Sequence, residues 1–208
     1  TRARLERTLA RQAAGLDVRV HDVALSDADG TARIALMSAT GGTNTLHAGD
    51  GHPALQSLEI PTLRLETFFE SGRIADCQLV KCDTEGHDLA VLRGAAPLLR
   101  QGRIKVLQFE YNHRWIYARS YLRDVFELTA GLPYRMARIM PTHIEWLPAW
   151  HPELERYFEA NFLLVHASAE GWFAAHAGHF DGSNVWRRTG VSARSVPAST
   201  IRASGGNG

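Results

Sequence analysis

The segment Leu79-Val80-Lys81-Cys82-Asp83-Thr84-Glu85-Gly86-His87-Asp88 changes from an apolar run to a polar cluster within a few residues. The apolar half predicts a buried strand, and the residues after it predict a turn and then a helix. Open α/β sheets bind their ligands at the carboxyl ends of such strands. Because burying unpaired charge is costly, two carboxylates and an imidazole at one strand end indicate a functional site rather than core.

This segment belongs to a predicted strand–helix–strand unit. We expect a strand over residues 77–83, an amphipathic helix over 87–99 and a second apolar strand over 105–111. The unit has about 35 residues, the length of a right-handed parallel crossover. Gly94 and Pro97 predict a break within the helix.

The rest of the chain also reads as alternating strands and helices. We expect helices over residues 2–14, 67–71, 121–130 and 172–176, and strands over 18–25, 31–37, 60–65, 134–140 and 161–166. The turn residues 26–30 predict that the strands on either side of them form a hairpin. Gly, Ser, Arg and Thr dominate the C-terminal end, so we expect disorder from about residue 190.

The composition is that of an ordinary globular protein. The chain has 208 residues, of which 45% are hydrophobic and 22% charged, and one domain accommodates this length. A net charge of +1 argues against nucleic acid or an anionic membrane as partner. No apolar stretch reaches the roughly 20 residues of a membrane helix. Cys77 and Cys82 point to opposite faces of one predicted strand, so we expect reduced thiols and a cytoplasmic location.

The second strand of the central unit also ends in polar residues. If the two strands are parallel neighbours, their polar ends meet at one edge of the sheet. Such a cleft suits general-base chemistry or the orientation of a hydroxyl group. The residues expected to line it are Asp83, Glu85, His87, Glu110, Asn112 and His113.

Structural roles are the alternative for each of these residues taken singly. Asp83 or Thr84 caps the following helix in that interpretation, since both residue types suit the position. Glu110 then forms a structural ion pair with Lys81 or Arg114. Coincident polar ends on two adjacent strands favour the functional interpretation.

A metal site is a further alternative. Asp83, Glu85 and His87 alternate like ligands, and carboxylates suit Mg²⁺ or Mn²⁺, which would allow a metal-dependent hydrolase. The spacing lacks the specificity of a zinc signature, so we expect no metal.

Residues 80–95 resemble the signature of the FkbM family of S-adenosylmethionine-dependent methyltransferases. In that family a strand ends in Lys-x-Asp-x-Glu-Gly, and an acidic helix leads into Leu-x-Gly-Ala. Other segments resemble the family in matching order. Residues 23–27 resemble its third-strand end, 44–46 its loop asparagine, 63–68 the strand before the signature, 108–112 the following strand end and 159–163 the final strand. We therefore expect a methyltransferase domain over residues 1–167 and a C-terminal extension over 168–208.

The resemblance implies a Rossmann-like α/β sheet of the class I methyltransferase type. It also implies S-adenosylmethionine as cofactor and methyl transfer to a hydroxyl of a sugar or natural product, hence a small-molecule or glycan acceptor. In such enzymes the first strand ends in a glycine-rich turn and the second in an acidic residue that holds the ribose. By order both would precede Thr1, so we expect this chain to lack the first two strands.

The resemblance also assigns site residues. The cofactor lies against the third and fourth strand ends, at Val23, Ala24, Leu25 and Asp83. The catalytic group is Asp83, Glu85 and His87. The acceptor side is Glu110, Asn112 and His113. The identity of the base stays open at this point, because position favours Asp83 and an ordinary pKa near 6.5 favours His87.

A noncatalytic α/β module that binds a partner or glycan is the alternative function. The observation behind it is that no glycine-rich strand-to-helix turn of the kind that cradles a nucleotide is found in the sequence.

Overall fold

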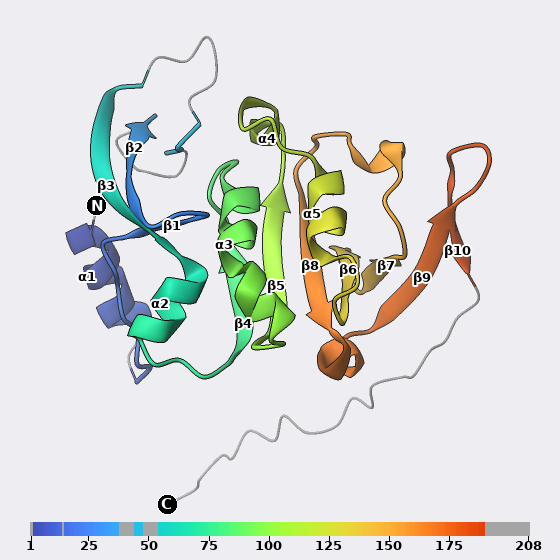
Figure 1. Ribbon diagram of the computed structural model, residues 1–208, viewed down its shortest axis with the longest axis horizontal. Coiled ribbons are helices and arrows are strands. Elements are labelled where there is room, and N and C mark those ends of the chain that lie inside the picture. The colour runs from blue at the N-terminus through green and yellow to red at the C-terminus, as the bar shows by residue number, and fades with distance from the viewer. Residues whose placement is uncertain (1, 14, 38–43, 48–53, 190–208) are drawn as a thin grey trace, which may run out of the picture.

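The computed structural model describes residues 2–13, 15–37, 44–47 and 54–189. Its strands form two sheets that lie side by side in Figure 1. The three-stranded sheet, in the order β1-β3-β2, contains β1 (Ala24–Ser26), β2 (Gly30–Leu36) and β3 (Gln56–Arg64). The seven-stranded sheet, in the order β10-β9-β7-β6-β8-β5-β4, contains β4 (Cys77–Cys82), β5 (Ile104–Tyr111), β6 (Tyr134–Ile139), β7 (Ile144–Leu147), β8 (Ala160–His166), β9 (Ala175–Phe180) and β10 (Trp186–Thr189).

Five α-helices and two short 3₁₀ helices connect these strands in the described part of the chain. They are α1 (Arg2–Gln12), α2 (Leu65–Ser71), α3 (Asp88–Arg100), α4 (Arg114–Tyr117), α5 (Leu122–Thr129), η1 (Pro152–Leu154) and η2 (Ala167–Trp172). The expected α/β class is confirmed.

The central strand–helix–strand unit forms as predicted. β4 and β5 are parallel neighbours, with Leu79 opposite Val106 and Lys81 opposite Gln108. The expected break in the helix was wrong, because α3 runs without interruption through Pro97. Proline removes one helical hydrogen bond, and its lost acceptor is the carbonyl of the exposed Arg93, which water can reach.

Side chains along β5 alternate between the two faces of the seven-stranded sheet, as the period of a strand requires. Leu107, Phe109 and Tyr111 are buried in one cluster with side chains of α3 and α5, which cover this face in Figure 1. Val106 packs on the opposite face in a second buried cluster with Leu163. We call the side that carries Val106 and Leu163 the second face.

The expected hairpin between the first two strands was wrong. β3 lies between them, parallel to β1 and antiparallel to β2. Asp29 in the connecting turn explains this arrangement, because its carboxylate accepts hydrogen bonds from the backbone NH of Arg64 at 2.7 Å and from Thr67 Oγ1 at 2.9 Å. These bonds tie the turn to the end of β3.

The C-terminal strands were largely missed from the sequence. β7 and β9 pair in parallel and β10 pairs antiparallel to β9, so the large sheet continues to Thr189. The helix expected over residues 172–176 was wrong, since η2 ends at Trp172 and β9 begins at Ala175. The apolar residues of β9 do not alternate in the way that predicts a half-buried strand. The expected disorder from about residue 190 lies outside the described residues.

Helix α3 packs directly on the backbone of β1 at Gly94. A Cβ atom placed on Gly94 would lie 2.0 Å from the carbonyl oxygen of Ser26. Only a residue without a side chain permits this approach. The contact joins the small sheet to the helix that covers the large one.

The substitution Gly94→Ala tests this contact. Alanine favours helix by about 1 kcal/mol over glycine, yet we expect a net loss of about 1–3 kcal/mol in the free energy of unfolding, because the methyl group must displace the Ser26 carbonyl. Chemical denaturation measures it. The matched control is Gly171→Ala, since a Cβ atom there would have no neighbour within 4 Å. Equal stabilities for the two variants would contradict the contact.

Candidate functional site

A pocket of about 460 Å³ separates the two sheets at their facing edges. β1 is an edge strand of the small sheet and β4 an edge strand of the large one. The pocket brings together the residues expected on the cofactor side, Val23, Ala24, Leu25 and Asp83, and adds His87. Its other lining residues are Ile34, Asn44, Thr45, Leu46, Ile60, Val80, Lys81, Cys82, Thr84 and Val91.

His87 lies at the start of α3 and is held through both ring nitrogens. Its Nε2 lies 2.9 Å from Ser26 Oγ, and its Nδ1 lies 2.9 Å from Nε2 of His47. Ser26 Oγ also donates to Asp27 Oδ1 at 3.2 Å, which fits a chain of hydrogen bonds running from His47 to Asp27. Burial and the neighbouring His47 lower the pKa of His87 to about 4. The imidazole therefore links three segments and has no ring nitrogen left for a substrate.

Asp83 and Glu85 each face a cation at the end of β4. Asp83 Oδ2 lies 2.8 Å from Nζ of Lys81, and both side chains are about half exposed. Hydrogen bonding to Asp83 raises the pKa of Lys81. Glu85 Oε2 lies 2.8 Å from Nε of Arg114. These pairings differ from the alternative in which Glu110 takes Lys81 or Arg114 as its partner.

The turn that carries Glu85 has an unusual backbone. Glu85 has φ +55° and Gly86 has φ +99°, so two successive residues are left-handed. A Cβ atom on Gly86 would lie 2.8 Å from Cβ of Arg114, which makes glycine necessary for space as well as for conformation. Thr45 Oγ1 donates to the Glu85 carbonyl at 2.7 Å. The turn is therefore fixed on two sides.

Glu110 and Asn112 lie at the end of β5, outside the pocket lining. Glu110 Oε2 accepts a hydrogen bond from Asn112 Nδ2 at 2.7 Å. Asn112 is buried, and its Oδ1 accepts from the backbone NH of Arg114 at 2.9 Å. Burial raises the pKa of Glu110 to about 7, and the negative charges of Asp83 and Glu85 add to the effect. A carboxylate with such a pKa suits proton transfer near neutral pH.

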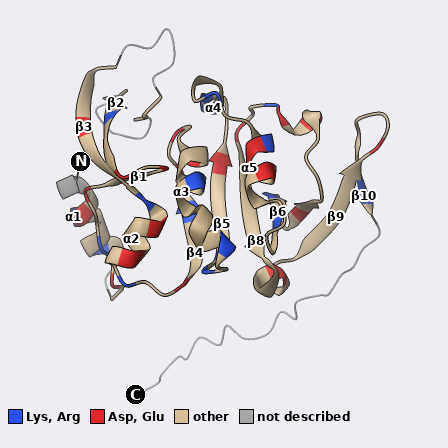
Figure 2. Ribbon diagram, in the orientation of Figure 1, with Lys and Arg blue, Asp and Glu red and all other residues tan. Residues whose placement is uncertain are grey.

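The charge pattern around this strand end is visible in Figure 2, where the tip of β5 is acidic and α4 carries a basic residue. His113 is exposed and precedes α4. The expected cleft is thus divided: Asp83 and His87 line the pocket, Glu85 is paired with Arg114, and Glu110 and Asn112 form a separate pair.

Three polar residues of this region were not predicted from the sequence. Ser26 and His47 hold His87, but nothing in their spacing indicates the contact. Asp88 is buried in the first turn of α3, where it accepts from Thr84 Oγ1 at 2.9 Å and its Oδ1 has no partner among the described residues. Burial raises its pKa. For Asp88, the signal available in the sequence was an acidic residue in the first turn of a predicted helix, a position that the helix dipole favours.

Among the described residues, no group of three or more His, Cys, Asp or Glu side chains is arranged to hold a metal ion. The helices of this described part are also too short or too polar to cross a membrane.

The low pKa of His87 makes the folded state sensitive to acid. Unfolding returns the pKa from about 4 toward 6.5, so the unfolded state binds more protons between these values. His87 therefore contributes a stability that is complete above about pH 6.5 and is lost on acidification toward pH 4, with a slope of at most about 1.4 kcal/mol per pH unit. Glu110, whose pKa is raised to about 7, contributes a slope of opposite sign over much of this range, because its folded form holds the proton more tightly than its unfolded form. Denaturation curves across this range measure it.

His87→Gln should remove the His87 contribution, so the stability of this variant relative to the parent should increase as the pH falls from 6.5 to 4. His179→Gln, at an exposed position on β9, should leave the pH dependence of the parent unchanged. Burial also lowers the pKa of His47, which contributes in the same sense as His87 and is present in both proteins. An unchanged slope in His87→Gln would contradict the assignment.

Comparison with known proteins is consistent with this arrangement. The family model described as the methyltransferase FkbM domain matches residues 2–149, which include β1, the pocket and the ends of β4 and β5. No curated protein and no solved structure matches the chain. Since the match covers well over half of the 208 residues, the chain belongs to the FkbM methyltransferase domain family.

Proposed function

We propose that this protein transfers a methyl group from S-adenosylmethionine to a hydroxyl oxygen of a small-molecule or glycan acceptor, such as a sugar or natural product. The observation that carries the proposal is the position of Asp83. On one side it lines the pocket with residues 23–25, and on the other its charge acts on Glu110, whose pKa is about 7. A donor site and a proton acceptor therefore adjoin one strand end.

The pocket suits the cofactor in chemistry and size. Val23, Leu25 and Ile34 offer apolar surface for an adenine ring, and Asp83 offers a carboxylate for a cationic group. About 460 Å³ falls within the range of small-molecule sites. When bound, S-adenosylmethionine would supply a methyl group on a sulfonium sulfur, and the C–S bond would break as the acceptor oxygen bonds to the carbon, releasing a neutral thioether.

Glu110 is the base in this proposal. His87 has both ring nitrogens occupied, and the carboxylates of Asp83 and Glu85 are each paired with a cation. Glu110 keeps Oε1 free of the hydrogen bond from Asn112, which engages Oε2. Its carboxylate takes the proton of the acceptor hydroxyl as the oxygen bonds to the methyl carbon. Asn112 holds the carboxylate in place, so that alignment contributes to the rate.

Two further strands complete the sheet in this proposal, in the gap alongside β1 and β4. Both strands present an edge that has no backbone partner among the described residues. The cofactor then lies against β1 at residues 23–25 and beside Asp83 at the carboxyl end of β4, where open sheets bind their ligands.

A noncatalytic binding module is the second candidate, and the same open gap between β1 and β4 favours it. It differs from the methyltransferase in one measurable respect. Calorimetry on the full-length protein detects S-adenosylmethionine binding only if the enzyme hypothesis holds, and absence of binding would contradict that hypothesis.

Glu110→Gln tests the role of the base. We expect transfer of labelled methyl to a panel of hydroxylated acceptors to fall about 10²–10⁴-fold, the usual worth of general-base catalysis, with cofactor affinity unchanged. In the parent protein kcat should rise with pH through about 7, because the ionised form of Glu110 is the active one.

The matched control is Glu127→Gln, at an exposed position on α5. It should keep both the rate and the pH profile. If Glu110→Gln retains the parent's rate and its rise near pH 7, another residue is the base.

A further inference from the structure

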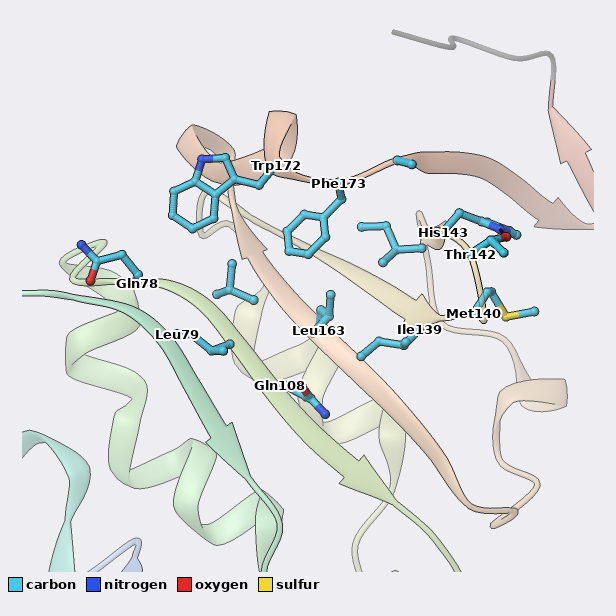
Figure 3. A pocket seen from close by; sticks show the side chains of 13 residues that line it. Gln78, Leu79, Gln108, Ile139, Met140, Thr142, His143, Leu163, Trp172 and Phe173 are labelled. Carbon is cyan, nitrogen blue, oxygen red and sulfur yellow. Dashed lines mark hydrogen bonds between the residues drawn. The ribbon is translucent and has the colours of Figure 1, made fainter. Parts of the chain in front are cut away.

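A second pocket, of about 450 Å³, lies on the second face of the seven-stranded sheet. Figure 3 shows Trp172 and Phe173 over the strands, opposite Leu79, Leu163 and Ile139. Leu79 is 56% exposed and Trp172 is 54% exposed, and Ile139 is exposed as well. Large apolar side chains gathered in this way around a hollow mark a binding surface rather than isolated exposure.

Polar groups border this pocket toward the end of β5. Gln108 lines it, and its Nε2 donates to Asn161 Oδ1 of the neighbouring strand β8 at 2.8 Å. Its side-chain carbonyl oxygen lies outside that bond. Thr142 and His143 add polar atoms on another side. Apolar walls with a few placed polar groups are typical of small-molecule sites.

The strand register places this pocket on the same face as the proposed base. Gln108 lies opposite Leu163, and Glu110 lies opposite Asn161. Val106, Gln108 and Glu110 are separated by steps of two residues, so they share one face. At about 3.3 Å per residue, Glu110 lies roughly 7 Å beyond Gln108 and roughly 13 Å beyond Val106. The apolar pocket and the carboxylate thus lie on one face of β5, with the polar Gln108 and Asn161 between them.

We propose that the pocket on the second face binds the apolar part of the acceptor. The acceptor is then amphipathic: it carries an acyl chain or aromatic ring within roughly 7–13 Å of the hydroxyl that reaches Glu110. This inference rests on the proposed function for the role of Glu110. The pocket volume accommodates such a group, and part of its wall is formed by strands β4, β5 and β8, which position a site more precisely than loops do.

Binding of n-alkyl glucosides, measured by calorimetry without S-adenosylmethionine, tests the proposal. The probes are methyl, hexyl and octyl glucoside, each below the concentration at which it forms micelles. Burial of the chain should raise affinity about fourfold per methylene group, so octyl glucoside should bind about 15-fold more tightly than hexyl glucoside. Affinity that is independent of chain length would overturn the proposal.

Two substitutions at the pocket mouth locate the site. Trp172→Ala and Leu79→Gln should each weaken octyl glucoside binding about tenfold, the worth of a partly buried apolar side chain. The matched controls are Phe158→Ala and Leu58→Gln, at residues that are 76% and 40% exposed and lie outside the pocket lining. Thermal unfolding verifies that all four variants fold. Equal losses in controls and pocket variants would overturn the assignment.

The outcome separates this inference from the proposed function. Chain-length-dependent binding supports the pocket even when Glu110→Gln leaves the rate of methyl transfer unchanged, a result that contradicts Glu110 as the base. Methyl transfer that is unaffected by Trp172→Ala and Leu79→Gln would support the enzyme and overturn the apolar site.

Discussion

The close packing of Gly94 on the Ser26 carbonyl is the contact on which the rest of the structure depends. It fixes the three-stranded sheet against α3, and α3 in turn covers the seven-stranded sheet. Residues 23–25 consequently face the end of β4, and Ser26 is held where its hydroxyl meets His87. A side chain at position 94 would separate the two sheets and open the pocket between them.

The ends of β4 and β5 divide their charged groups between two tasks. Lys81 and Arg114 neutralise Asp83 and Glu85, which allows two carboxylates to lie close together at the strand end. Among the described residues the Glu110 carboxylate bonds to the neutral Asn112 and has no counterion at hydrogen-bonding distance, so burial and the neighbouring carboxylates act on it without compensation. This difference in partners gives one carboxylate of the group a pKa near neutrality, and the same strand leads from it to an apolar pocket.

The central unit was predictable because its signals are local. Apolar runs, an amphipathic helix and polar strand ends lie within about 35 residues, and β4 and β5 are parallel as expected. The small sheet was not predictable, because the bond from Arg64 to Asp29 that places β3 between β1 and β2 joins residues far apart in sequence. The same holds for the site. Asp83 and Glu110 follow from strand ends, and residues 23–25 followed only from the family resemblance, whereas the bond between His47 and His87 leaves no trace in the sequence.

The most direct test of this account is an experimental structure of the full-length protein with S-adenosylmethionine bound. The account predicts adenine against Val23 and Leu25, and the methyl group beside Asp83, directed toward Glu110. A cofactor bound elsewhere, or one whose methyl group points away from Glu110, would contradict the assignment of donor and acceptor sides at the end of β4.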